Sequence, residues 1–274
     1  MSGKAAESRE FSRLAIEQAW AAGDVPVALQ AETNALVEDL VGWTPATAVL
    51  TTAEALLETA AAYPSVRGDV LRLLALLEAM VGRLDDARAH ASESVRLLEE
   101  LGYPSAASLA RGDKSWVERL GDDLPAAERD LRTVVTAAAA AGDRTLLSWG
   151  ACRLAQVLME QGRLDDAEPY LEEAEHVDMV MNRSRVLGAR ARLQAARGRP
   201  EAADLVAELV EALEAIEFPN IRVDGFIDAA EATAVLGDRP RAVRYANEAL
   251  RLAEAKGNVT RARQIRTIIA RIQP

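Results

Sequence analysis

The sequence contains few of the residues that most often mark covalent or metal chemistry. Its 274 residues include one cysteine and two histidines. A single cysteine, Cys152, excludes an intrachain disulfide and suits a reducing compartment. His90 and His176 lie in unrelated sequence surroundings, and neither has partners at metal-binding spacing. The sequence therefore predicts no metal site, no catalytic residues and no cofactor.

Lysine, aromatic residues and long apolar runs are also scarce. Only Lys4, Lys114 and Lys256 occur, none of them in a G-x-x-x-x-G-K loop, so no phosphate-binding loop is predicted. No apolar run approaches the roughly 18 residues of a membrane span, and the N-terminus MSGKAAESRE lacks the apolar core of a signal peptide. The net charge of −11 argues against nucleic-acid binding, which needs clustered Lys and Arg. We expect a cytoplasmic protein without nucleic-acid or membrane partners.

What the sequence does contain is a glycine-led turn motif that recurs about every forty residues. It reads GRLDDA at 82–87 and 162–167, GDDLPAA at 121–127, GRPEAA at 198–203 and GDRPRA at 237–242, with a degenerate GWTPAT at 42–47. The leading glycines are Gly42, Gly82, Gly121, Gly162, Gly198 and Gly237. Such a period is typical of stacked helical hairpins. We predict an all-α right-handed superhelix of about six helical pairs plus terminal helices, 13 or 14 helices in all.

The residues around each glycine suit a helix–turn–helix. Apolar residues before the turn fall at helical spacing, as in Val70, Leu73, Leu74, Leu77 and Val81. Each leading glycine is expected to take the left-handed conformation that ends a helix. The Asp pairs at 85–86, 122–123 and 165–166 recur at one repeat position, so we interpret them as helix-start residues and not as acid/base dyads. An alanine in each turn is expected at the contact of the paired helices: Ala87, Ala167, Ala203 and Ala242.

The recurring turns predict one repeat solenoid over residues 1–274. The terminal helix covers 5–22, the repeats cover 24–257, and a capping helix covers 258–272. The hairpins are expected at 24–62, 65–101, 104–141, 143–181, 182–217 and 219–256. The segment 5–22 resembles the second helix of a hairpin whose first helix is missing. It is either a cut end of a longer solenoid, which we favour, or a helix adapted as a cap.

Several segments together resemble a known family. They are AAGD and GWTP within 21–45, LEAMVGRLDDAR at 77–88, LEELGYP at 98–104, QGRLDDAEPYLEEAE at 161–175, FPNIRVDGFIDAAE at 218–231 and KGN at 256–258. In order and spacing they resemble the C-terminal tetratricopeptide-like region of large bacterial ATP-binding signalling proteins, many of which carry an adenylate cyclase domain. The resemblance implies a non-catalytic interaction or sensor module, since the cyclase and ATPase segments are absent from this sequence.

In tetratricopeptide-type superhelices the first helix of each pair lines a concave groove. Counting back from the turn glycines gives the candidate binding residues Asp69, Arg72, Arg111, Glu118, Trp149, Gln156, Arg185, Arg192, Asp224 and Glu231. Arg111, Trp149, Arg192 and Asp224 are the predicted anchors. An arginine at a groove position is expected to do one of two things. It either forms two hydrogen bonds to a carboxylate of an acidic peptide or ligand, or it pairs with groove acids such as Glu118 and Glu231.

Two functions stay open at this point. The first is a non-catalytic module that binds a peptide segment, or a neighbouring domain of a longer chain, in its groove. The alternative is a small-ligand receptor domain of such a regulator. An enzyme is not expected, because no nucleophile, base or metal set converges. The basic C-terminal end is either a solvated cap or a docking patch for an acidic neighbour; it contains Arg251, Arg261, Arg263, Arg266 and Arg271.

Overall fold

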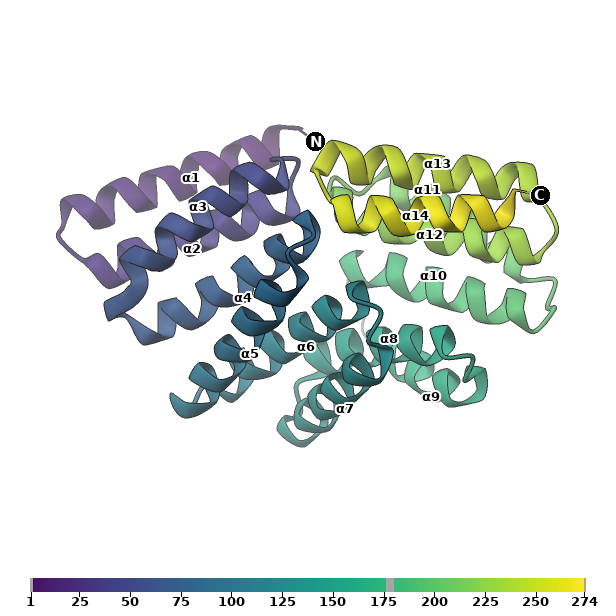
Figure 1. Cartoon of the computed structure of the whole chain (residues 1–274), viewed down its shortest axis with the longest axis horizontal. Helices are drawn as coiled ribbons and strands as arrows, with labels where there is room; N and C mark the ends of the chain where they lie inside the picture. The colour runs from purple at the N-terminus through teal and green to yellow at the C-terminus, as the bar shows by residue number, and fades with distance from the viewer. Residues whose placement is uncertain (1, 176–179, 274) are drawn as a thin grey trace. The chain divides into compact units, whose positions relative to one another are not determined.

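The computed structural model describes residues 2–175 and 180–273, where every regular element is helical (Figure 1). This part of the chain forms fourteen α-helices and one short 3-10 helix, η1. The predicted all-α class, with about six helical pairs and terminal helices, is confirmed for these residues. None of the described helices is both long and apolar enough to pass through a lipid bilayer. In chain order the elements are α1 (Ser2–Ala21), α2 (Val25–Val41), α3 (Ala46–Thr59), η1 (Ala60–Ala62), α4 (Pro64–Val81), α5 (Leu84–Glu100), α6 (Pro104–Leu120), α7 (Leu124–Ala141), α8 (Arg144–Glu160), α9 (Leu164–Glu175), α10 (Val180–Ala196), α11 (Ala202–Glu214), α12 (Pro219–Val235), α13 (Arg239–Lys256) and α14 (Val259–Ile272).

The chain divides into two compact units, Met1–Val117 and Glu118–Pro274. The boundary falls inside α6, so the second unit begins with the last residues of that helix. A single continuous solenoid and the right-handed sense of its superhelix stay predictions. Val180 already lies in α10, whereas the hairpin was expected to start at about 182.

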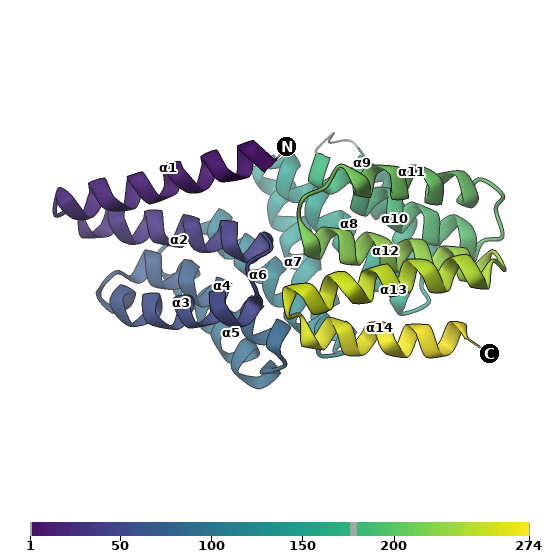
Figure 2. The same cartoon turned by 90° about the horizontal axis from the view of Figure 1, so that it is seen from above.

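In the first unit, α1 packs on α2, and α2 contacts both its partner α3 and the next first helix, α4 (Figure 2). The helices α4 and α5 are in close contact at Gly68. The Ser94 hydroxyl of α5 donates to the Gly68 carbonyl at 2.7 Å. A Cβ at Gly68 would lie 2.9 Å from side-chain atoms of Leu98. Glycine is therefore required by the packing of the two helices.

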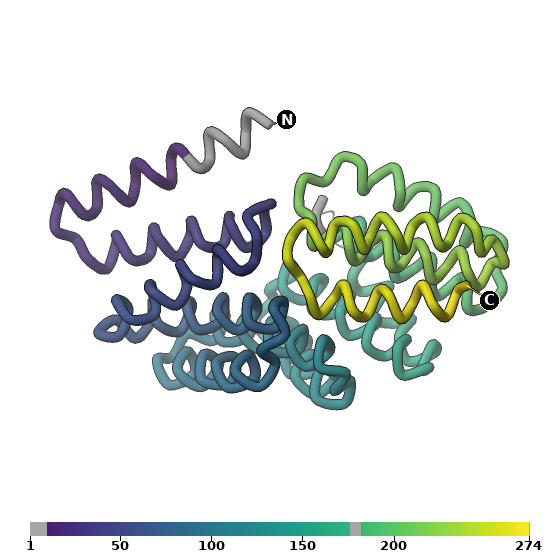
Figure 3. The backbone as a smooth tube through the Cα atoms, turned by 45° about the horizontal axis from the view of Figure 1, so that its top comes forward, coloured from purple at the N-terminus to yellow at the C-terminus, as the bar shows by residue number. Residues whose placement is uncertain are grey.

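In the second unit the first helices are neighbours, because α10 contacts both α8 and α12 (Figure 1). Each also packs on its own second helix, and α14 packs on α13 (Figure 3). One apolar cluster joins α10 to α14 and contains Leu209, Leu213, Phe226, Leu252 and Ile265. Another joins α7 to α10 and contains Leu131, Leu154, Leu158, Leu171 and Leu193. These clusters hold α8, α10 and α12 side by side, which positions the candidate site.

The turn glycines follow the prediction at four of six positions. Gly82, Gly162, Gly198 and Gly237 adopt the left-handed conformation, with φ between 68° and 92°. The prediction is wrong at Gly42, which has φ −80° and ψ −163°, an extended backbone that any residue adopts. It is also wrong at Gly121, because Asp122 takes the left-handed position with φ 60°. Aspartate tolerates this conformation better than most residues, since its short polar side chain bonds locally.

One of the four turn alanines also differs from its predicted position. Ala87, Ala167 and Ala242 are fully buried, as predicted. Ala203 is exposed, and the adjacent Ala202 is the fully buried residue. After Gly198 the amides of Ala202 and Ala203 donate three residues back, to Arg199 and Pro200, each at 3.3 Å. This tighter 3-10 geometry moves the helix contact one residue earlier.

The adjacent alanines give a matched test of this register. Ala202→Leu is expected to lower the free energy of unfolding by roughly 1–3 kcal/mol, because the added atoms overpack a filled contact. Ala203→Leu makes the same chemical change on an exposed site and should stay within about 0.5 kcal/mol of the parent. Urea unfolding of both variants makes the comparison. A larger loss of unfolding free energy in Ala203→Leu than in Ala202→Leu would instead support the register predicted from the sequence.

Candidate binding site

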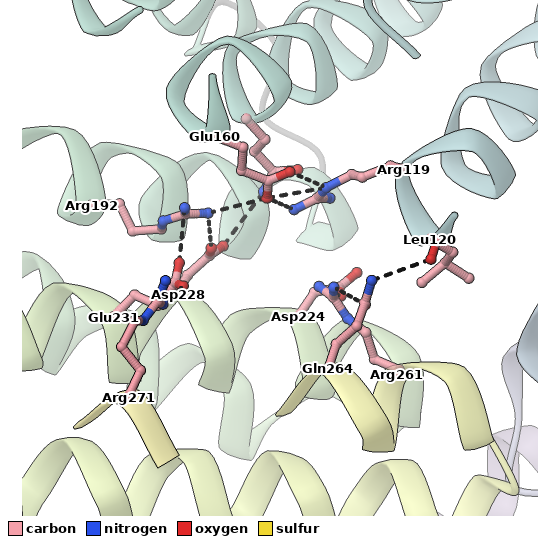
Figure 4. A network of polar contacts seen from close by, with 11 residues as sticks. Arg119, Leu120, Glu160, Arg192, Asp224, Asp228, Glu231, Arg261, Gln264 and Arg271 are labelled. Atoms are coloured by element: carbon pink, nitrogen blue, oxygen red, sulfur yellow. Dashed lines mark hydrogen bonds and ion pairs between the residues drawn. The ribbon is translucent and has the colours of Figure 1, made fainter. Parts of the chain in front are cut away.

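Charged side chains from α6, α8, α10, α12 and α14 meet in the second unit (Figure 4). We call this set the arginine–carboxylate network. Its four arginines and four carboxylates balance in formal charge. Its members are Arg119, Arg192, Arg261, Arg271, Glu160, Asp224, Asp228 and Glu231.

Arg192 of α10 is the centre of the network. Its Nη1 lies 3.0 Å from Asp228 Oδ1 and 3.8 Å from Glu160 Oε1, and its Nη2 lies 2.8 Å from Glu231 Oε2. The side chain is only 14% exposed. Arg119 binds the other side of Glu160, with its Nε donating to Oε2 at 2.9 Å. Arg192 therefore links α8 to α12, and Glu160 extends the link to the end of α6.

The remaining pairs connect α14 to the network. Arg261 donates from Nη2 to Asp224 Oδ1 at 2.7 Å and from Nη1 to Gln264 Oε1 at 3.0 Å. Gln264 in turn donates to the Leu120 carbonyl at 3.3 Å. Arg271 donates to Glu231 at 2.7 Å. The last helix is thus held to α12 at two points along its length, and to the end of α6.

Helical spacing explains why each helix contributes several members. Asp224, Asp228 and Glu231 follow one another at spacings of four and three on α12 and so share one face. Between helices the pairs are about one repeat apart: Arg119 and Glu160 are separated by 41 residues and Arg192 and Asp228 by 36. The stacked repeats therefore bring opposite charges together at equivalent heights.

Burial raises the pKa values of the network carboxylates, whereas ion pairing with arginines lowers them. Burial raises the pKa of Asp228 to about 6, although Arg192 and Arg119 oppose this rise. Burial also disfavours ionisation of Glu160, but Arg119 and Arg192 outweigh it and lower the Glu160 pKa. For Asp224, Arg261 and Arg119 likewise outweigh burial and lower its pKa. Of these three carboxylates, Asp228 is the one whose pKa is raised toward neutral pH.

The contact between α10 and α12 at Asp228 leaves no room for another side chain. Gln156 of α8 donates to Asp228 Oδ2 at 3.4 Å. A Cβ at Gly188 of α10 would lie 2.5 Å from the same oxygen and 2.9 Å from Asp228 Cβ. Glycine at 188 is therefore what allows the two helices to approach around the network.

Three of the predicted groove residues of this unit, Arg192, Asp224 and Glu231, are members of the network, and a fourth, Gln156, bonds to Asp228. Arg192 pairs with Glu231, one of the two arrangements that the sequence left open. Any ligand of Arg192 or Asp224 would have to replace these ion pairs.

The other predicted residues of this unit differ in their exposure. Trp149 is half-buried, and the Arg153 guanidinium lies 4.5 Å from its ring centroid, within the range of a cation–π contact. Arg185 is half-buried, and its charge lowers the pKa of Asp224. Glu118 is buried. Trp149 and Arg185 are therefore better placed to reach a ligand than Glu118.

The predicted residues of the first unit also form ion pairs. Arg72 Nη1 lies 2.7 Å from Asp113 Oδ2, and its Nε lies 3.9 Å from Asp69 Oδ1. Arg111 pairs with Glu99. Asp69 borders a cleft of about 350 Å³, and burial raises the pKa of its carboxyl group. Whether these three residues bind a partner stays a prediction.

The described residues do not converge on a metal or thiol site. No group of three or more His, Cys, Asp or Glu side chains within this part of the chain could hold a metal ion. His90 Nδ1 lies 2.8 Å from Glu78 Oε2, and Glu78 also pairs with Arg83 at 3.0 Å. His176 lies outside the described residues. Cys152 is fully buried, and burial raises the pKa of its thiol to about 12.

Five of the eight network members were not predicted as binding residues. Arg119, Glu160 and Asp228 were not among the candidate residues, and Arg261 and Arg271 were assigned only to a basic end of the chain. The sequence did contain a signal for these residues, namely pairs of oppositely charged residues about one repeat apart. Arg271 and Glu231, which are 40 residues apart, are an example.

An open cleft of about 400 Å³ lies beside the network in the second unit. We call it the C-terminal cleft, because the last residues of α14 form part of its wall. Its lining is mostly apolar, with three arginines and one glutamate. The residues are Met159, Leu164, Arg192, Ala196, Glu231, Ala232, Ala234, Val235, Arg239, Arg271 and Ile272.

Comparison with known proteins adds little to this geometry. No protein-family description matches the sequence, and no curated protein matches it. Among solved structures, the chain is similar to the crystal structure of the P58(IPK) TPR domain. The identity is 14%, the match covers 97% of this chain and 98% of that chain, and the TM-score is 0.32. A likeness this distant carries no argument about function, which has to come from the site itself.

Proposed function

We propose that this protein is a non-catalytic interaction module that holds an acidic polypeptide segment on the α8–α10–α12 face of its second unit. The observation that carries the proposal is the convergence of groove-position side chains from three successive first helices into one network. A network of mutually paired charges fixes its members in place before a partner arrives. Binding then requires little further ordering of the protein.

Two residues on this face are suited to contact the partner. Trp149 offers a large, flat apolar surface of the kind that is enriched at binding hot spots. Arg185 carries a planar guanidinium that recognises carboxylates with two parallel hydrogen bonds. Together they favour a segment in which an acidic residue follows or precedes an apolar one.

Peptide selection on the full-length chain tests this proposal. Peptides selected from a displayed random library are expected to be enriched in Asp and Glu. The double variant Trp149→Ala/Arg185→Gln should weaken the selected peptides more than tenfold while the melting temperature and helical signal stay close to the parent. The matched control is Trp43→Ala/Arg251→Gln, which changes an exposed tryptophan and an exposed arginine elsewhere. Equal affinity in the two double variants would reject this face as the binding surface.

We extend the proposal to a biological context on the resemblance described above. The module senses a partner for a larger bacterial regulator with an ATP-binding domain. The reading frame around the gene tests this extension directly. An ATPase or cyclase domain in the same frame, or in the adjacent gene, supports it, and a frame that holds neither counts against it.

A further inference from the structure

The C-terminal cleft has an apolar floor that is partly open to solvent: Ala196 and Val235 are exposed, whereas Met159 and Ile272 are only 8% and 6% exposed. Met159, Ala196, Val235 and Ile272 bring apolar atoms to it from four different helices. Val235 is 62% exposed, the highest value among the large apolar side chains described in this unit. A single exposed valine is ordinary. Here it lies in a concave site with other apolar residues, where a ligand could remove it from water.

The edge of the cleft carries an excess of positive charge. Three arginines and one glutamate line it, and Arg192 is already paired with Asp228 and Glu231. The excess therefore comes from Arg239 and from Arg271, which shares Glu231 with Arg192. The Arg271 side chain is 68% exposed. Arg239 is exposed and forms no ion pair with any residue that the structure describes. In a chain with a net charge of −11, this local excess selects for an anion.

We infer that the C-terminal cleft binds a small amphipathic carboxylate, with the carboxylate on Arg239 and Arg271 and the aliphatic tail on the apolar floor. The volume of about 400 Å³ sets the size. At roughly 30 Å³ for each water-sized group, it takes a molecule of about a dozen non-hydrogen atoms. The cleft shares Arg192 and Glu231 with the network, but neither of the proposed peptide contacts, Trp149 and Arg185, lines it.

Decanoate, which has the expected size, is the probe for this site. Isothermal titration of the full-length chain should show saturable binding of one decanoate, below the concentration at which it forms micelles. The uncharged decanol and the cationic decyltrimethylammonium share the tail and should bind at least tenfold more weakly. Equal binding of decanol would show that the arginines do not contribute, and it would overturn the inference.

Two double variants separate the cleft from general charge effects. Arg239→Gln/Arg271→Gln removes both proposed contacts and should weaken decanoate at least tenfold. Arg244→Gln/Arg263→Gln removes two exposed arginines from the same two helices, α13 and α14, away from the cleft, and should leave the affinity unchanged. Similar losses in both variants, or no saturable binding to the parent chain, would refute the site.

A third variant tests the floor. Ala196 is exposed and lines the cleft, so Ala196→Leu should fill it without disturbing the core. Loss of decanoate binding with unchanged selected-peptide binding is the expected result. If decanoate binding survives this change, the tail does not occupy the cleft. Since the two ligands respond to different variants, failure of one proposal is distinguishable from failure of the other.

Discussion

Replacing Arg192 with alanine is expected to lower the free energy of unfolding by about 3–5 kcal/mol, because it removes one side of several buried ion pairs. Arg192 contacts Asp228, Glu231 and Glu160, and the Asp228 side chain is only 4% exposed. Without the guanidinium these carboxylates would remain close together with less compensation. Urea unfolding followed by circular dichroism gives the measurement.

Two further variants identify the cause of that loss. Arg251 is 60% exposed and pairs with Glu248 on the surface of α13, so Arg251→Ala should cost about 1 kcal/mol or less. Adding Asp228→Asn to Arg192→Ala removes a buried negative charge and should recover part of the loss. If Arg192→Ala is as stable as the parent, or if Asp228→Asn makes it worse, the network does not support the fold as described.

The stability of the protein should also depend on pH through Asp228. Its pKa is about 6 in the folded chain, against about 3.9 for an unperturbed aspartate. Between these values the folded chain keeps a proton that the unfolded chain releases. The contribution of Asp228 to the free energy of unfolding is therefore largest below about pH 4 and falls by about 2–3 kcal/mol as the pH rises through 6.

Comparison with Asp228→Asn isolates this effect. Urea unfolding of parent and variant at several pH values from 4 to 7 gives their stability difference, and the variant should gain relative to the parent as the pH rises. Glu160 and Asp224 act in the opposite direction, since their lowered pKa values give stability that is lost as the pH falls. Both are present in the two proteins, so their contribution largely cancels. A pH-independent difference would contradict the prediction.

Sequence reasoning succeeded where structure depends on residues close together in the chain. Helix starts followed from carboxylates in the first turn, and Asp85, Asp86, Asp165 and Asp166 lie there. Asp123 and Asp238 cap α7 and α13 by accepting from backbone amides three residues ahead. These are local effects of the helix terminus, so spacing and residue type are enough to predict them.

It failed where the outcome depends on how one repeat meets the next. Counting from the turn glycine places Ala203 at the helix contact, but the turn geometry after Gly198 decides that Ala202 lies there. The groove count gave Arg192 and Asp224 as open positions, and of their partners it included only Glu231. Asp228 and Arg261, 36 and 37 residues away along the chain, occupy them instead. Such pairing depends on how the helices pack in three dimensions, and residue spacing within one helix gives no information about that packing.

The turns themselves have an evolutionary consequence. A Cβ added at Gly162, Gly198 or Gly237 would meet nothing within 4 Å, so only the left-handed backbone resists substitution there. That resistance is about 1–2 kcal/mol for an ordinary residue and smaller for aspartate or asparagine. The turn between α6 and α7 already places Asp122 at the left-handed position. A hairpin of this kind can therefore lose its marker glycine through drift and keep its shape, and distant relatives should be sought by helix pattern rather than by the glycine motif.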